Sequence, residues 1–455
     1  MRGRRTLVFS LAFLLAGALA PIGASAQTAG EVSSDAALQT SYDDAFASMM
    51  ADPQNLDKTF AFAEVAARKG DLEGAVSALE RMLFVNPDLP RVKLELGVLY
   101  FRLGSYETAR AYLQSALDAP EVPQAVRDRA NTFLSEIDRR ASVNQLTGSL
   151  FGGMRVQSNA NAAPSGTGVM ANGLASTLSS QFTKKGDFNL FAAGSVKDVY
   201  DFQDQNRDTM EATLSAYSAR QQSQTLFNLT FFELTVGPRI PVPSDWLWEG
   251  GTLNMRAYAI YDYVDLHDDP YYRAPGAGYE FLSQIRPGTV MQVNFEARDK
   301  HFQNSGIFPL NNEQTGVEML GRGQIIQAIT DQLAALVGGT FSKDNSSSSF
   351  QAYHYYDYSA GLTWSFDAPF KLTELPWSLT GTATRAFYVY DQPDPSVDPF
   401  DTRFDRDWRF AAISTIPLDT DLSVVTTIGR TIRQSSISNY QFNNNYASIG
   451  ISWRF

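Results

Sequence analysis

The sequence of 455 residues contains no cysteine and only three histidines. The absence of cysteine excludes disulfides, thiolate metal sites and thiol nucleophiles, and three histidines leave little imidazole for acid–base chemistry. Positive charge is also scarce, because 37 Lys and Arg stand against 49 Asp and Glu, for a formal net charge of −12. Nucleic-acid binding needs clustered Lys and Arg. The composition therefore disfavours most enzyme classes and nucleic-acid partners.

The first 26 residues have the pattern of a signal peptide. Arginines within the first five residues precede the short apolar stretch Leu7–Leu19, and Ala24 and Ala26 supply the small residues of a cleavage site before Gln27. This stretch is shorter than the roughly 20 residues of a transmembrane helix, and no later apolar stretch is long enough. We therefore expect an exported protein that is not a helical membrane protein.

Residues 27–144 have helical periodicity and repeat themselves at a fixed offset. Three pairs lie 34 positions apart, namely Gly70 and Gly104, Ala75 and Ala109, and Pro53 and Pro87. That offset is the period of a tetratricopeptide repeat, in which small residues let two helices approach and glycine forms the turn between them. The residues predicted to carry this structure are Ala63, Gly70, Ala75, Pro87, Gly97, Tyr100, Gly104, Ala109 and Ala116. Flanking helices are expected to cap the stack, and a helical bundle with chance spacing is the alternative.

Tetratricopeptide repeats bind extended or helical segments on a concave surface that the first helix of each unit lines. In this chain the predicted concave face carries Phe60, Glu64, Arg91, Leu94, Val98 and Phe101. None of these residues suggests catalysis. We expect a docking groove for a periplasmic client protein or chaperone.

From residue 145 to the end the hydrophobic period changes to two. In the last predicted strand Phe455, Trp453 and Ile451 alternate with Arg454 and Ser452, so that one face is apolar and the other polar. Tyr and Trp near predicted strand ends fit the girdles of an outer-membrane barrel better than a soluble β-sandwich, and closure is how a sheet spans lipid. The predicted fold is an α-helical tetratricopeptide-repeat module (27–144) followed by an antiparallel transmembrane β-barrel (145–455).

Strand number follows from the links, which should be short on the periplasmic side and long outside. Tight links are predicted at 184–187, 286–289, 330–332, 368–375 and 417–420, and long links at 158–172, 267–275, 301–313, 343–351, 391–403 and 434–444. These alternate only if Thr209 to Pro238 forms one bent strand, which gives about 14 strands, with about 16 as the alternative. Arg385 falls on the apolar side of its predicted strand.

Charged residues of both signs fall on the predicted inner face of the barrel. They are Arg155, Lys197, Arg256, Glu280, Glu296, Arg298, Glu318, Arg322, Asp357 and Arg454. Such a lumen is either a polar conduit or a closed barrel filled by salt bridges, and both interpretations stay open.

Catalytic and metal-binding motifs are absent from the sequence. It has no Gly-x-x-x-x-Gly-Lys loop, no Gly-x-Ser-x-Gly elbow and no His-Glu-x-x-His helix. The aspartates between Asp391 and Asp401, and those beside His267, offer oxygen ligands to Ca²⁺, but a solvated acidic loop is the favoured interpretation. We predict no catalytic residue, no metal and no cofactor, with a barrel hydrolase as a minor alternative.

Two segments, Gly152–Pro164 (GGMRVQSNANAAP) and Asp269–Tyr279 (DPYYRAPGAGY), match the surface lipoprotein assembly modifiers of Gram-negative bacteria, which the whole architecture also resembles. The resemblance implies an outer-membrane protein with periplasmic repeats that helps to export or assemble surface lipoproteins or other secreted proteins. The terminal aromatics Trp453 and Phe455 resemble the signal by which the barrel assembly machinery recognises its clients, so this machinery and outer-membrane lipid are expected partners. An exopolysaccharide export porin is the second interpretation, and a general outer-membrane channel is the third.

Overall fold

The computed structural model describes residues 32–455 except 53, 120–121, 245–250 and 374. The predicted signal peptide, with its cleavage residues Ala24 and Ala26, lies outside the described residues. The chain divides into two compact units, a helical one within Thr28–Gln145 and a β-unit from Leu146 to Phe455. No described helix is long and apolar enough to span a bilayer.

The helical unit contains six described helices. They are α1 (Val32–Ala51), α2 (Leu56–Lys69), α3 (Leu72–Val85), α4 (Pro90–Arg102), α5 (Tyr106–Leu117) and α6 (Gln124–Ala141). Local chemistry sets the bounds of α2 and α3, because the side chains of Asn55 and Asp71 accept the first backbone N–H groups of these helices. Gly70 and Gly104 follow α2 and α4 with φ values of +92° and +76°, a conformation that glycine adopts without strain.

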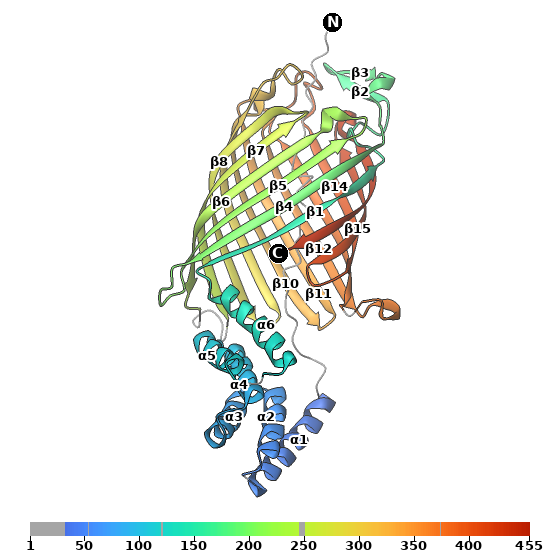
Figure 1. The fold of residues 1–455 in the computed structure, drawn as a ribbon. Helices are drawn as coiled ribbons and strands as arrows, with labels where there is room; N and C mark the ends of the chain where they lie inside the picture. Colours follow the sequence, from blue (N-terminus) through green and yellow to red (C-terminus); the bar gives the residue numbers. More distant parts are fainter. Residues whose placement is uncertain (1–31, 53, 120–121, 245–250, 374) are drawn as a thin grey trace. The chain divides into compact units, whose positions relative to one another are not determined.

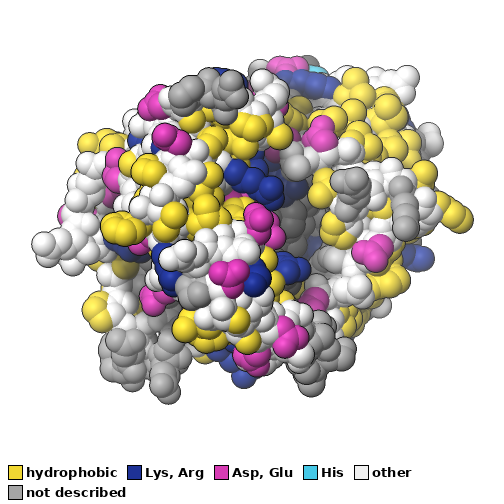
Figure 2. All heavy atoms as spheres, turned by 60° about the horizontal axis from the view of Figure 1, so that its bottom comes forward, with side chains coloured by type: hydrophobic (Ala, Val, Ile, Leu, Met, Phe, Trp, Pro, Cys, Tyr) yellow, Lys and Arg dark blue, Asp and Glu magenta, His cyan; other side chains and the backbone are white. Residues whose placement is uncertain are grey.

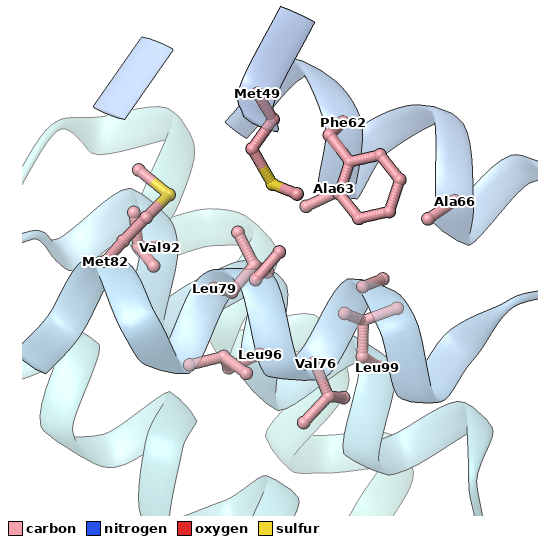
Figure 3. Packing of buried hydrophobic residues seen from close by; sticks show 12 residues of the cluster. Met49, Phe62, Ala63, Ala66, Val76, Leu79, Met82, Val92, Leu96 and Leu99 are labelled. Carbon is pink, nitrogen blue, oxygen red and sulfur yellow. The ribbon is translucent and has the colours of Figure 1, made fainter. Parts of the chain in front are cut away.

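Small residues hold the helices of this unit close together. Ala75, Ala109 and Ala116 are completely buried, and Ala63 is 3% exposed. A Cβ on Gly97 would lie 2.6 Å from Leu113 Cγ, so α4 and α5 approach too closely for a larger residue. Figure 3 shows the core at the other end of the stack, where Phe62 and Ala66 of α2 face the apolar side chains of α3 and α4.

The β-unit is a closed antiparallel barrel of 14 strands in which β1 pairs with β16 and β2–β3 form a separate hairpin (Figure 1). The strands are β1 (Asn144–Gln157), β2 (Gly168–Ala171), β3 (Leu174–Thr177), β4 (Asp187–Asp201), β5 (Thr209–Gln221), β6 (Leu229–Val242), β7 (Thr252–Leu266), β8 (Asp269–Arg286), β9 (Thr289–Phe302), β10 (Gly316–Thr330), β11 (Leu333–Ser346), β12 (Tyr353–Phe366), β13 (Trp377–Tyr390), β14 (Phe404–Pro417), β15 (Leu422–Ser435) and β16 (Phe442–Arg454). Short 3-10 helices lie in the links: η3 (Ser180–Phe182), η4 (Thr225–Phe227), η5 (Asn311–Gln314), η6 (Pro369–Lys371) and η7 (Ser438–Tyr440). The predicted fold class, a helical module followed by a barrel of 14 strands, is confirmed.

The outer face of the barrel is apolar and the inner face is polar. On β7, for example, Ala257 and Ala259 are exposed whereas Arg256 and Tyr258 are buried. Exposed side chains on other strands, such as Val337 on β11, have the same parity as these alanines. A closed sheet with an apolar exterior satisfies its backbone hydrogen bonds internally, which is the requirement for crossing lipid. The β-unit is therefore an outer-membrane-type barrel.

Three predicted links are wrong. Thr209 to Pro238 is not one bent strand but β5 and β6, joined through η4. The predicted tight link at 184–187 belongs to one long connection, 158–186, which contains the β2–β3 hairpin. The two errors cancel in the strand count. The first error arose because 222–228, between β5 and β6, contains neither glycine nor proline, the residues that usually mark a turn.

The third wrong link is 267–275, which was predicted to be long. His267 and Asp268 alone form the turn, with φ values of +57° and +62°, and β8 begins at Asp269. Two consecutive positive φ values match the twist of flanking strands in a tight hairpin. Neither residue is glycine, so the sequence carries no strong signal for this turn.

Candidate functional site

The first candidate site is an exposed cluster on α2 and α4. Arg91 places its guanidinium 4.8 Å from the ring centroid of Phe60, and its Nη2 lies 3.6 Å from Oε1 of Glu64. The side chains of Arg91 and Glu64 are 70% and 54% exposed. An ion pair that exposed contributes about 0–1 kcal/mol. A carboxylate of a partner can therefore replace Glu64 at little cost.

The other half of the predicted concave face is not accessible. Leu94 and Val98 are 2% and 8% exposed and pack in one cluster with residues of α5 and α6. Phe101 meets Phe133 of α6 edge to face, with ring centroids 5.3 Å apart. The prediction that Leu94 and Val98 belong to a binding surface is thus wrong, because the capping helix covers them.

Charged residues that the sequence analysis did not select extend the exposed cluster. Glu95 of α4 pairs with Arg129 of α6, at 2.5 Å between Oε1 and Nη1. Glu95 follows Arg91 by four positions, which places both on one side of the helix. We call the set Phe60, Glu64, Arg91, Glu95 and Arg129 the docking face. The i, i+4 spacing of Arg91 and Glu95 was the signal that could have revealed it.

Other polar contacts of the helical unit brace the helices against each other. The Tyr100 hydroxyl donates to Oε1 of Glu80 at 2.7 Å, and this hydrogen bond raises the pKa of Tyr100 to about 12. The Tyr42 hydroxyl donates to Oδ2 of Asp71 at 2.6 Å, which lowers the pKa of that carboxyl. These hydrogen bonds join residues that are 20 and 29 positions apart in the sequence, so they hold separate helices together.

The second candidate site is the inner wall of the barrel, where predicted lumen charges meet partners of opposite sign. On β4 to β8, Glu211 is 5% exposed and accepts from Lys197 at 2.9 Å and from Arg239 at 2.7 Å. Arg256 lies 3.4 Å from the same carboxylate, and Arg239 reaches Glu280 at 2.6 Å. Three cations thus share two carboxylates on one stretch of wall.

A second group surrounds Arg298 of β9. Its guanidinium lies 2.8 Å from Asp262, 3.2 Å from Glu233 and 2.5 Å from Glu296. Arg298 is 12% exposed and Asp262 is 5% exposed. One cation therefore holds three carboxylates from strands β6, β7 and β9 together.

A third group joins β9, β10 and β11 through Lys300. Its ammonium lies 3.3 Å from Glu318 and 2.6 Å from Asp344. Among the other predicted lumen residues, Asp357 accepts a hydrogen bond from Tyr355 at 2.6 Å and Arg155 lies over the ring of Phe191. Arg322 and Arg454 are exposed.

The densest group lies on β14 and β15, and the sequence analysis missed it. Asp405 and Asp407 are fully buried. Arg433 donates to Asp407 at 2.7 Å, Arg409 lies 3.0 Å from the same carboxylate, and Arg403 lies 2.6 Å from Asp405. Trp408 and Phe410 are exposed on the outer face of β14, so strand alternation places residues 407 and 409 inside.

In these four groups the charges of the inner wall are paired with side chains of opposite sign on the same strand or on nearby strands. Figure 2 shows Lys and Arg side chains with Asp and Glu side chains near them on the face that it presents. Buried charges are tolerated when they are paired and hydrogen-bonded, and removing one partner is strongly destabilising. The inner wall is thus cross-linked from strand to strand by ion pairs.

The aspartates of the link between Asp391 and Asp401 make contacts with nearby side chains and backbone. Asp391 pairs with Lys343 at 2.6 Å, Asp394 accepts from Ser396, and Asp398 accepts from the backbone of Phe400. Within the part of the chain that the structure describes, no group of three or more His, Cys, Asp or Glu residues is arranged to hold a metal ion.

A family model for the tetratricopeptide repeat matches residues 60–125. The helical unit is a tetratricopeptide-repeat module. The match covers α3, α4 and α5 with parts of their neighbours, which are the helices that carry the 34-residue offset. No curated protein matches the sequence.

Solved structures resemble the two units separately. The module is similar to PcrH in complex with the chaperone binding region of PopD, at 17% identity, 24% of this chain, 83% of that chain and a TM-score of 0.22. The barrel is similar to OccAB4 from Acinetobacter baumannii, at 7% identity, 69% of this chain, 98% of that chain and a TM-score of 0.33. It is also similar to an anion-selective porin from Comamonas acidovorans, at 7% identity, 69% and 99% coverage and a TM-score of 0.33.

Proposed function

We propose that this protein acts in the export or assembly of surface lipoproteins or other secreted proteins across the outer membrane. The repeat module lies in the periplasm, where its docking face captures a segment of the client or of a chaperone that carries it. The barrel, inserted by the barrel assembly machinery, gives that client its route to the cell surface. The protein has no catalytic activity of its own, so clients leave it chemically unchanged.

The observation that carries this proposal is the exposed docking face on a repeat module that is covalently joined to the first barrel strand. Arg91 and Glu64 form a weak, replaceable pair beside the aromatic ring of Phe60. A peptide offering a carboxylate to Arg91 and an apolar side chain to Phe60 would gain a charge-assisted hydrogen bond and apolar burial together. A channel for small solutes has no use for such a surface.

The test compares a deletion strain with strains that carry the wild-type chain, R91E or R81E. Arg81 lies on α3, outside the docking face, and R81E makes the same change of charge. Surface proteins are released by protease shaving and quantified by mass spectrometry. We expect a defined set of lipoproteins to disappear in the deletion strain, to remain depleted with R91E and to return with R81E.

A deletion strain whose surface protein profile equals that of the wild type would refute the proposal. Loss of extracellular polysaccharide with an unchanged protein profile would favour the polysaccharide export interpretation. Reduced uptake of small solutes, with both of these unchanged, would favour a general channel. Clients of altered covalent mass would contradict the absence of catalysis.

A further inference from the structure

The outer face of the barrel carries three arginines on adjacent strands. Arg385 is the ninth residue of β13, Arg406 the third residue of β14 and Arg430 the ninth residue of β15. All three lie on the same side of the barrel wall as exposed apolar residues, because Arg385 pairs with Trp408 and Arg430 pairs with Phe410. The arginine on the apolar side of β13 is therefore a real feature of the outer face and not an error of register.

All three arginines lie in the half of the barrel remote from the rim where β1 begins and Phe455 lies. β13 and β15 run away from the rim at which Phe455 pairs with Gly148, and β14 starts at the opposite rim. With the repeat module in the periplasm, as proposed above, this half faces the outer leaflet. An arginine on a lipid face costs about 2–4 kcal/mol at mid-membrane and about 0–1 kcal/mol near the interface.

These arginines have no acidic partner. Among the described residues none of the three forms an ion pair, whereas the neighbouring outward Lys343 is held by Asp391 at 2.6 Å. The guanidinium of Arg385 lies about equally far from the rings of Phe387 and Trp408, at 5.0 and 4.9 Å. Its Nη1 is shielded from solvent without a hydrogen-bond partner. Three adjacent cations thus lack the anion that would neutralise them.

A groove lies on the same face. It has a volume of about 880 Å³ and is almost wholly apolar, with Arg430 in its wall. Five adjacent strands each contribute two outward residues and the inward residue between them to its lining, such as Ala360, Gly361 and Leu362 on β12. Because outward residues outnumber inward ones on each of these strands, the groove opens outward and not into the lumen. Small residues, among them Ala383 on β13, form its floor.

We propose that this face binds a phosphorylated, acylated lipid of the outer leaflet, with an acyl chain in the groove and phosphate on Arg385, Arg406 and Arg430. Guanidinium groups bind phosphate through paired, charge-assisted hydrogen bonds. An apolar groove beside the cations fits a chain attached to the same headgroup. On β6, by contrast, the outward residues include Phe232, Leu234 and Val236 and no charge.

The test uses the full-length protein in detergent and native mass spectrometry with titrated lipid. The probes are diphosphorylated lipid A, the same lipid after removal of both phosphates, and inorganic phosphate. We expect the wild type to bind diphosphorylated lipid A at least about tenfold more tightly than the dephosphorylated form, since one charge-assisted bond lost weakens binding by about that factor. The triple variant R385Q/R406Q/R430Q should lose this preference.

Matched variants separate the proposal from bulk effects. R220Q/R273Q removes two outward arginines on β5 and β8 and should bind like the wild type. A383F fills the groove and should weaken binding of lipid A without changing that of inorganic phosphate. Heat-modifiable gel mobility reports folding, and if the triple variant fails to fold, R430Q alone is titrated and should lose at least about half of the preference on a logarithmic scale.

Three results would overturn the proposal. One is a triple variant, or a folded R430Q, that keeps the wild-type preference. Another is that inorganic phosphate displaces lipid A equally well from the wild type and from A383F, because the groove would then contribute nothing to lipid binding. The third is a wild-type dimer that A383F dissociates with lipid binding unchanged, since the groove would then be an interface between copies. Lipid binding is measured on purified protein and export is measured in cells. Absence of lipid A binding would therefore not count against the export proposal, and an unchanged surface protein profile would not count against lipid binding.

Discussion

Replacing Asp71 by alanine should destabilise the repeat module through two separate losses. Oδ1 accepts the backbone N–H of Gly74 at 2.9 Å as the N-cap of α3, and Oδ2 accepts the Tyr42 hydroxyl at 2.6 Å, which ties α1 to the α2–α3 turn. A lost N-cap costs about 1 kcal/mol, and a hydrogen bond to a charged group contributes about 1.5 kcal/mol or more. We expect D71A to lower the free energy of unfolding of the module by about 2–3 kcal/mol.

The assay is urea unfolding of the full-length protein in detergent, followed by the circular dichroism of the helices. Y42F removes only the hydroxyl and should cost about 1–1.5 kcal/mol, whereas D71N retains a good capping residue and should cost less than D71A. The double variant Y42F/D71A should cost no more than D71A alone, because the two residues share one bond. A full sum of the single effects, or a D71A cost below about 0.5 kcal/mol, would refute the reasoning.

The same contact predicts a dependence on pH. The Tyr42 hydroxyl, followed by the Gly74 N–H, lowers the pKa of Asp71 below its ordinary value of 3.8. A carboxyl whose pKa is lowered by folding stabilises the folded state above its unfolded pKa and loses that contribution as the pH falls through the folded one. The stability difference between wild type and D71A should thus be constant above about pH 5 and shrink below about pH 4.

Two further substitutions test close packing and the buried charges. G97A should destabilise the module by about 1–3 kcal/mol, because its Cβ would lie 2.6 Å from Leu113 Cγ. In the same urea assay G97A should cost less in an L113A background than in the wild type, because the clashing side chain is gone; an unchanged midpoint for G97A would contradict that close approach. D407N should destabilise the barrel by about 3–5 kcal/mol, since it removes the buried negative charge that lies 2.7 Å from Arg433 and 3.0 Å from Arg409, and a lower temperature of heat modification on gels would show it. G166A, which adds a Cβ to open space in the 158–186 connection, is the control that should leave that temperature unchanged.

The fold followed from patterns that act over short distances. Alternation back from Phe455 locates strands, and the 34-residue offset of Gly70 and Gly104 locates helices. Turns without glycine or proline, such as the one at His267 and Asp268, depend on the pairing of the strands that they join. Periodicity carries no information on that pairing, and the same limit explains why β5 and β6 were taken as one strand.

The candidate sites were predictable to a smaller extent. Parity assigns Arg256 and Arg298 to the inner face, but the partner of each charge depends on the register between strands that are distant in sequence. Glu211 and Arg239 lie diagonally across β5 and β6, two positions apart in the pairing, and no local pattern marks them as partners. On the helices, spacing places Leu94 and Val98 on one side, but only the packing of α6 decides that they are covered.

The pairing of β1 with β16 has a consequence for biogenesis. Met154 lies opposite Ile449 and Gly148 exchanges hydrogen bonds with Phe455, so the closing contacts join residues separated by most of the β-unit. Contacts this distant in sequence form late, because the intervening chain must be ordered first. The contacts of the repeat module join helices that are close in sequence, so the module is able to fold before the barrel closes. Under the proposed function, the module would thus be ready to bind its client while the barrel is still an open sheet.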